Sequence, residues 1–211
     1  MPVDSQPASQ PTPAGSGPPA HVRRLGRAER REQILAAATQ AFARAGFAAT
    51  SLADIAAEAG ISRVILYRHF DSKTDLYRAV LDRVMARLVA AVGKRDYTDA
   101  SVDALVAAAA EDPAGFRLLF QHAAREPEFR AEADRFHAGM VAVSRRELAR
   151  AIPEGAWARW AARLAPTVAI EAIIAWLDAG QPDPEQAPER VRQALSGVLQ
   201  AARPPTEGRS P

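Results

Sequence analysis

The 211-residue chain contains no cysteine, which excludes disulfide bonds, thiolate metal sites and a cysteine nucleophile. Asparagine is also missing, so the sequence has no acceptor for N-linked glycosylation. No uninterrupted apolar run approaches the roughly 18 residues that cross a bilayer. The first twenty residues contain six prolines and lack the hydrophobic centre of a secretory signal. We therefore expect a cytoplasmic protein without a membrane partner.

Signatures of catalytic, metal and cofactor sites are missing too. The sequence has no G-x-S-x-G nucleophile elbow and no glycine-rich phosphate loop leading into a helix. The histidines do not have the spacing of metal ligands: they are His21, His69, His122 and His137. Carboxylates are plentiful, but no pair of them is marked as a catalytic acid and base. We therefore expect neither an enzyme nor a bound cofactor or metal.

Charge is unevenly distributed, although the net charge is only +2. Residues 21–95 carry 14 Lys and Arg against 7 Asp and Glu, whereas residues 96–202 carry 11 against 16. A basic first portion joined to an acidic remainder favours a protein that meets a polyanion with one end. Ordinary variation of surface charge explains the same counts equally well.

Apolar residues recur at helical spacings of three and four, and no segment alternates as a strand does, so we expect an all-α fold. Helices are predicted at about 26–46, 52–59, 62–70, 73–92, 100–110, 113–125, 127–151, 157–179 and 185–202. Gly46, Gly60 and Gly93 end the earlier helices. Pro113 and Pro127 suit first turns. Pro166 either kinks the helix at 157–179 or marks its true start.

The stretch AAEAGIS joins two short helices through a tight glycine turn, as in a helix-turn-helix. In the second helix Leu66 and Phe70 are four residues apart and share one face, which we expect to be buried. The opposite face is then exposed and carries basic, aromatic and branched side chains: Arg63, Val64, Ile65, Tyr67 and Arg68. A helix of this width fits the DNA major groove. An ordinary hairpin inside a larger helical bundle has the same pattern.

The side chains of this face suit contacts with DNA. Arg63 can form two hydrogen bonds with one guanine, worth about 1–3 kcal/mol of discrimination. Val64 and Ile65 have no polar side-chain group and fit against thymine methyl groups. Three further residues lie where a hydroxyl, an imidazole and an ammonium group can meet phosphates: Tyr67, His69 and Lys73.

The stretch from Arg27 to about Leu81 resembles the DNA-binding domain of the TetR family of bacterial transcriptional regulators. The matching segments are RREQILAAATQAFARAGF, TSLADIAAEAGIS, LYRHF and DSKTDLYRAVLD. The resemblance implies base-reading or backbone-contacting roles for Thr50, Ser51, Arg63, Val64, Ile65, Tyr67, Arg68, His69 and Lys73. Family members often carry a small residue where Val64 stands and threonine where Ile65 stands. We therefore expect an operator that presents thymine methyl groups.

The resemblance also implies a domain plan and a function. It places a three-helix DNA-binding domain with the helix-turn-helix at 21–72 and a larger helical domain for ligand binding and dimerisation at 73–202. Residues 1–20 and 203–211 are predicted to be disordered tails. The implied function is that of a homodimeric repressor, released from a palindromic double-stranded DNA operator by a small-molecule inducer. The alternative is a helical protein-binding scaffold without sequence-specific DNA binding.

Three groups of residues outside the helix-turn-helix are candidates for other contacts. Large apolar and polar residues of the middle helices form the candidate ligand pocket: Leu105, Phe116, Phe120, His122, Phe136, His137, Met140, Glu171 and Trp176. Apolar stripes of the last two helices form the candidate dimer interface: Leu164, Val168, Ala172, Ala175, Val191, Leu195, Val198 and Leu199. The basic arm Arg23, Arg24 and Arg27 either reaches DNA or is a solvated linker.

Overall fold

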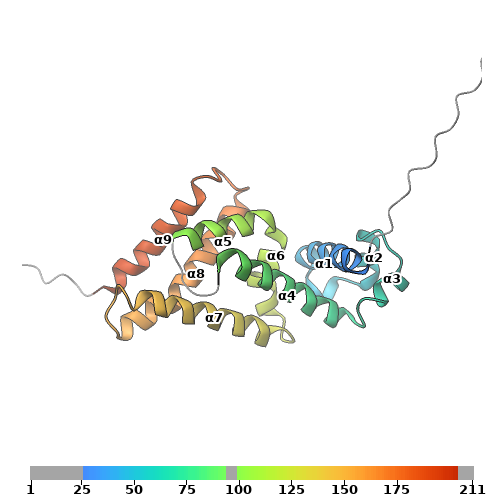
Figure 1. The fold of residues 1–211 in the computed structure, drawn as a ribbon, viewed down its shortest axis with the longest axis horizontal. Helices are drawn as coiled ribbons and strands as arrows, with labels where there is room; N and C mark the ends of the chain where they lie inside the picture. The colour runs from blue at the N-terminus through green and yellow to red at the C-terminus, as the bar shows by residue number, and fades with distance from the viewer. Residues whose placement is uncertain (1–25, 94–98, 204–211) are drawn as a thin grey trace, which may run out of the picture.

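The computed structural model describes residues 26–93 and 99–203, and every regular element in these ranges is helical (Figure 1). This confirms the predicted all-α fold. The order is α1 (Arg27–Ala49), α2 (Leu52–Glu58), α3 (Arg63–Tyr67), α4 (Lys73–Val92), α5 (Asp99–Glu111), α6 (Pro113–Arg117), η1 (Leu118–His122), η2 (Ala123–Arg125), α7 (Arg130–Leu148), α8 (Ala156–Asp178) and α9 (Ala187–Ala202). The predicted tail at 1–20 lies outside the described residues, as does the tail at 203–211 apart from Arg203.

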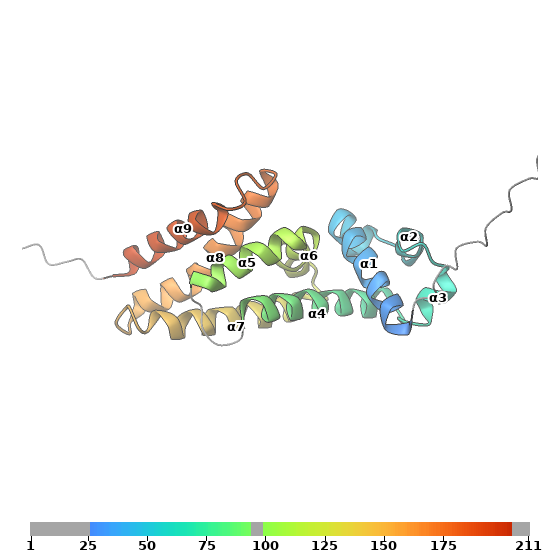
Figure 2. The same ribbon diagram turned by 45° about the horizontal axis from the view of Figure 1, so that its top comes forward.

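Helix α4 connects two groups of helices. Figures 1 and 2 show α1, α2 and α3 gathered at one end of the molecule and α5, α7, α8 and α9 at the other. The 20 residues of α4 span about 30 Å at the usual helical rise. One cluster of buried apolar side chains continues from Ile34 of α1 through Leu81 of α4 to Ile173 of α8. The predicted domain boundary at residues 72 and 73 falls at the start of α4 and stays a prediction.

Several helices begin or end at other residues than predicted. Helix α3 ends at Tyr67 rather than Phe70, because Ser72 already caps α4 by accepting a hydrogen bond from Asp75 N (3.0 Å). The predicted helix at 113–125 is divided into α6, a π-helical turn and a 3-10 turn. Helix α7 begins at Arg130, so the predicted first-turn position of Pro127 is wrong.

Two of the predicted interruptions behave differently from each other. Gly46 does break the regular path of α1, with φ of 76°, but one more turn follows it to Ala49. Glycine adopts this left-handed conformation without the steric cost that a side chain brings. Pro166 lies buried within α8, so it does not mark the start of that helix.

Helix α8 is the most apolar long helix of the described residues. By length and composition it could cross a membrane, which inspection of uninterrupted apolar runs did not reveal. Ile170, Ile173, Ile174 and Leu177 of α8 are nevertheless buried among the other helices. Core helices of soluble proteins pass the same test of length and composition, so this feature is explained by the central place of α8 in the fold.

Candidate DNA-binding surface and ligand cavity

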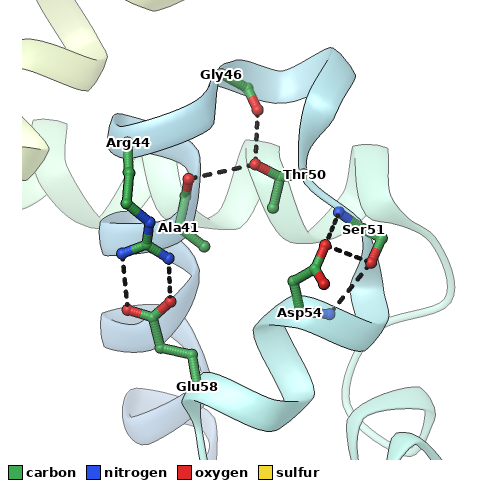
Figure 3. A network of polar contacts seen from close by, with 7 residues as sticks. All are labelled: Ala41, Arg44, Gly46, Thr50, Ser51, Asp54 and Glu58. Atoms are coloured by element: carbon green, nitrogen blue, oxygen red, sulfur yellow. Dashed lines mark hydrogen bonds and ion pairs between the residues drawn. The ribbon is translucent and has the colours of Figure 1, made fainter.

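A reciprocal cap fixes the start of α2 (Figure 3). The backbone N–H of Ser51 donates to Asp54 Oδ2 (3.0 Å), and the backbone N–H of Asp54 donates to Ser51 Oγ (3.1 Å). The Ser51 hydroxyl also donates to Asp54 Oδ2 (2.6 Å). These hydrogen bonds hold the pKa of Asp54 below its usual value, and Arg63 adds a smaller electrostatic effect. The cap satisfies backbone donors that a helix start leaves unpaired.

Thr50 has an internal role that sequence reasoning did not predict. Its side chain is buried, and its hydroxyl lies 2.7 Å from the Gly46 carbonyl oxygen and 3.2 Å from that of Ala41 (Figure 3). These hydrogen bonds tie the end of α1 to the start of α2. The hydroxyl is thus buried and engaged within the protein, and the predicted place of Thr50 near the DNA backbone stays a prediction.

Helices α1 and α2 are also joined on the solvent side. The guanidinium of Arg44 donates to the carboxylate of Glu58 through two nitrogens (Figure 3). The hydrogen bond and the opposite charge of Glu58 raise the pKa of Arg44. Exposed ion pairs of this kind contribute little to stability, so the pair mainly sets the geometry of the two helices.

A tight turn sets α3 at an angle to α2. Gly60 has φ of 63°, which a residue with a side chain rarely adopts, and the backbone N–H of Ile61 donates to the Ala56 carbonyl oxygen (2.9 Å). Ala56 is buried, and its small side chain lets the helices approach each other. Gln33 of α1 donates to the Ala59 carbonyl oxygen (2.7 Å) at the end of α2. The turn is therefore held from both sides.

Helix α3 presents the face that the sequence predicts. Leu66 is 0% exposed and Phe70, just beyond the helix, is 2% exposed, so both anchors are buried as expected. On the opposite side Val64 is 63% exposed and Tyr67 is 54% exposed. Arg63 and Arg68 are exposed as well, and Ile65 is partly buried. The predicted orientation of this helix is confirmed, although no contact with DNA is tested by it.

Lys73 is engaged within the protein. Its ammonium donates to the carbonyl oxygens of Phe47 (2.8 Å) and Ala48 (3.3 Å) and lies 4.4 Å from the centre of the Phe47 ring. These carbonyls belong to the last turn of α1, where the helix dipole favours a cation. In the structure Lys73 therefore caps α1, and its predicted phosphate contact stays a prediction.

His69 is partly buried beside a group of arginines. Burial lowers the pKa of His69, and the positive charges of Arg27, Arg31 and Arg30 lower it further. Arg31 also stacks its guanidinium over the ring of Phe70, 4.6 Å from the ring centre. Of the basic arm, Arg27 is exposed at the start of α1, while Arg23 and Arg24 lie outside the described residues. This corner of the surface is thus strongly basic.

A cavity of about 570 Å³ lies in the other half of the molecule, between α4, α5, α7, α8 and α9. Four of the predicted pocket residues line it: Leu105, Phe120, Phe136 and Met140. The other five do not, and their placement corrects the prediction: Phe116, His122, His137, Glu171 and Trp176. Phe116 is buried in the core, His137 and Glu171 are exposed, and Trp176 donates to the Pro182 carbonyl oxygen (2.8 Å).

Most of the predicted dimer residues are used inside one subunit. Leu195 and Leu199 line the cavity, and Val191 and Val198 are buried in the core. Three of the α8 residues are partly buried, Leu164, Val168 and Ala172, whereas Ala175 is exposed. Much of the apolar stripe of α9 thus packs within the subunit, and its predicted role in a dimer interface stays a prediction. The exposed face of α9 carries Ala194, Gly197 and Ala201 instead.

An aromatic cluster connects the two halves. Tyr77 of α4 lies between Phe42 of α1 (ring centres 4.9 Å apart) and Phe129, the residue before α7 (4.3 Å). Phe47 also packs against Phe129 (4.9 Å). The Tyr77 hydroxyl is buried and has no hydrogen-bond partner among the described residues, and burial raises the pKa of Tyr77. Helix α7, which lines the cavity, is therefore packed at its start against the end of α1.

No group of three or more histidine and acidic side chains is placed to hold a metal ion in the part of the chain that the structure describes. The site available for chemistry is thus a surface of hydrogen-bond donors and apolar groups on α3, together with a largely apolar cavity.

Comparisons with known proteins identify the first half. The family of bacterial regulatory proteins described as tetR matches residues 34–80. The chain is 41% identical over 107 residues to the HTH-type transcriptional activator FasR of Mycolicibacterium smegmatis, covering 47% of this chain and 49% of FasR. It is 50% identical over 54 residues to the HTH-type transcriptional regulator TtgR of Pseudomonas putida, covering 26% of each. The chain therefore spans about half or less of these relatives.

A solved structure extends the likeness to the whole fold. A TetR-like transcriptional regulator from Rhodococcus sp. RHA1 has a TM-score of 0.72 over 84% of this chain and 99% of that chain, at 20% identity. At this identity the likeness shows the shared fold alone. The proteins named here are regulators, and none of them is named as an enzyme. Residues 34–80 therefore match the family of bacterial regulatory proteins described as tetR, and the described residues share the fold of a TetR-like regulator.

Proposed function

We propose that the protein is a sequence-specific DNA-binding transcriptional regulator and that α3 is its recognition helix. The observation that carries this proposal is the exposed face of α3, held outward by buried Leu66 and Phe70. The N-terminal residues of such a helix reach base edges when it lies in the major groove. The protein acts in the cytoplasm, where the chromosome is accessible to it.

The exposed side chains divide into base-reading and phosphate-binding groups. Arg63 pairs with guanine through two hydrogen bonds, and Val64 and Ile65 contact thymine methyl groups. Tyr67 and Arg68 lie at the edge of the same face and suit contacts with the DNA backbone. The remaining phosphate contacts come from Ser51, which caps α2, and from His69, which follows α3. A phosphate beside His69 would offset the arginine charges that lower the pKa of its imidazole.

The protein acts as a homodimer on a palindromic operator. The exposed faces of α8 and α9 are the surfaces left for a partner, and Ala194, Gly197 and Ala201 are small enough for a close approach of α9 to another helix. A two-fold axis then places two copies of α3 in successive major grooves, roughly 34–36 Å apart. A charge at this surface, as in Ala201→Glu, is expected to give monomers that bind the operator weakly.

We further propose that a small molecule in the cavity releases the protein from its operator, so that it acts as a repressor. A ligand that favours a spacing of the α3 helices unsuited to DNA by a few kcal/mol empties the operator. The aromatic cluster around Tyr77 supports this route, because it joins the start of α7 to the end of α1. FasR is named an activator, so the direction of regulation needs its own test.

Gel-shift titration against DNA upstream of the protein's own gene tests DNA binding. We expect sequence-specific affinity that falls steeply with salt, since phosphate contacts release counterions. Arg63→Ala should weaken binding by about 1–3 kcal/mol and relax base preference at one position of each half-site. Arg145→Ala, an exposed arginine on α7, is the matched control and should leave affinity unchanged. Equal affinity for unrelated DNA would point instead to a protein-binding scaffold.

A reporter gene behind the operator tests the direction of control. Deletion of the regulator should raise expression if the protein represses. A fall in expression would contradict repression and leave DNA binding intact as a separate conclusion.

A further inference from the structure

The cavity is lined by apolar side chains with few polar groups among them. The polar side chains in its lining are Ser101, Arg135, Ser144 and Glu147. Glu147 is already neutralised by Arg150, whose guanidinium donates to its carboxylate (2.6 Å). Arg135 is the one cationic side chain that the structure places in this lining, and no ion pair or hydrogen bond to it is found within residues 26–93 and 99–203. An apolar chamber thus has a single unmatched charge at its edge.

Ser144 is a second unmatched group. Its side chain lines the cavity, and the residue is only 5% exposed. Among the described residues no hydrogen bond to its hydroxyl is found. A hydroxyl in an otherwise apolar wall can form a hydrogen bond with an oxygen of a molecule that occupies the cavity. Ser144 thus offers a ligand one polar contact within the apolar lining.

Arg135 and Ser144 lie at the two edges of the side of α7 that lines the cavity. Residues 135, 136, 139, 140, 143 and 144 of this helix line the cavity, so the face runs along the chamber. The helical rise puts Arg135 and Ser144 about 13 Å apart along the axis. One small anion cannot contact both, whereas an elongated molecule can. Phe136 and Met140 lie between them and offer apolar contact to its body.

We propose that the cavity binds an elongated amphipathic acid, with its carboxylate at Arg135 and its apolar body along α7 toward Ser144. A carboxylate matches the planar guanidinium with two parallel hydrogen bonds, which gives orientation as well as affinity. The lining then removes the apolar body from water. Arg135 is exposed to solvent, so the head lies at the mouth and the body lies inside. This inference rests on the proposed function in taking the cavity as the effector site.

Calorimetric titration of the full chain with three probes that share one tail tests the charge of the head. The probes are dodecanoate, dodecanol and dodecyltrimethylammonium, each kept below the concentration at which it forms micelles. Dodecanoate should bind at least tenfold more tightly than the other two. Arg135→Gln should lower dodecanoate affinity at least tenfold and leave dodecanol affinity nearly unchanged. Arg146→Gln, an exposed arginine on α7 outside the cavity lining, is the matched control and should behave as the wild type.

A second variant tests the location. An added Cβ at Gly139 would meet no atom within 4 Å, so the ring of Gly139→Phe can enter the cavity without a clash at its base. This variant should bind none of the probes. Unchanged dodecanoate binding by Gly139→Phe or by Arg135→Gln overturns the proposal, as does equal binding of dodecanoate and dodecanol by the wild type. Absence of any dodecanoate binding overturns it too.

The same protein without probes separates this inference from the proposed function. If the wild type binds its operator but dodecanoate behaves as dodecanol does, the ligand class is wrong and the DNA-binding proposal stands. If the wild type fails to bind specific DNA, the proposed function fails whatever the calorimetry shows.

Discussion

The two halves of the molecule pack their helices in different ways. Around α3 the helices are short, and caps and turns fix their ends. The anchoring side chains Leu66 and Phe70 are at most 2% exposed. Around α7 long helices enclose a cavity of about 570 Å³, a volume within the range of small-molecule sites. Dense packing resists deformation, while an unfilled chamber leaves room for its walls to move. The proposed DNA-binding face is therefore held rigidly, whereas the walls of the proposed effector cavity have room to move.

The largest expected effect comes from removing an anchor of the rigid half. Phe70→Ala deletes a buried ring, and the free energy of unfolding should fall by about 3–5 kcal/mol. Denaturant titration followed by circular dichroism measures this change. Val64→Ala on the exposed face is the matched control and should change the free energy of unfolding by less than about 0.5 kcal/mol. Similar small losses for both variants would show that this half is loosely packed.

Lys73 tests whether the rigid half depends on its internal cap. Lys73→Met keeps most of the apolar stem but removes the ammonium from the Phe47 and Ala48 carbonyls. We expect a loss of about 1–2 kcal/mol in the free energy of unfolding, in the absence of DNA. The same denaturant titration measures it. Unchanged stability, accompanied by weaker DNA binding, would show that Lys73 acts through a phosphate contact and not through this cap.

A substitution at Gly139 tests the packing around the cavity, and here we expect stability to increase. Its position inside α7 faces open space, so Gly139→Ala should improve helix propensity without a clash. The free energy of unfolding should rise by about 0.5–1 kcal/mol. Thermal unfolding of the two proteins without ligand measures the difference. A destabilised alanine variant would mean that the cavity wall is as tightly packed as the core around Phe70.

The smallest expected effect concerns pH and His69. The folded-state pKa of His69 is lowered, so below pH 6.5 the unfolded chain takes up its proton more readily than the folded protein does. The free energy of unfolding therefore decreases as the pH falls through this range, and at neutral pH His69 causes no such loss. His69→Gln should flatten that part of the stability profile, measured by denaturant titration at a series of pH values. An equally steep profile would assign the pH dependence to other groups.

Sequence reasoning succeeded where the partners are close in the chain. The cap of Ser51 on Asp54, the turn at Gly60 and the buried pair Leu66 and Phe70 each follow from spacings of three or four residues. Local spacing fixes which side chains share a face, and on α3 that was enough to predict the exposed surface.

It failed where the partner comes from far along the chain. Lys73 binds carbonyls 25 and 26 residues earlier, and Thr50 binds one from the preceding helix, so no local pattern shows that these polar groups are engaged. The stripe of α9 correctly indicates burial, yet a stripe does not say whether its partner is the same chain or another. Helix α8 is apolar on several sides, so its composition does not show which side faces the cavity.

Helix α4 contributes residues to both halves of the molecule. Its first residue, Lys73, caps α1, and its last turns contribute Leu88, Val89 and Val92 to the cavity wall. If the proposed effector changes operator affinity through α4, thermodynamic reciprocity requires operator DNA to change effector affinity by the same factor. Protein bound to the chromosome would then need a higher concentration of effector for binding than protein free in the cell. The ratio of these two concentrations measures the coupling.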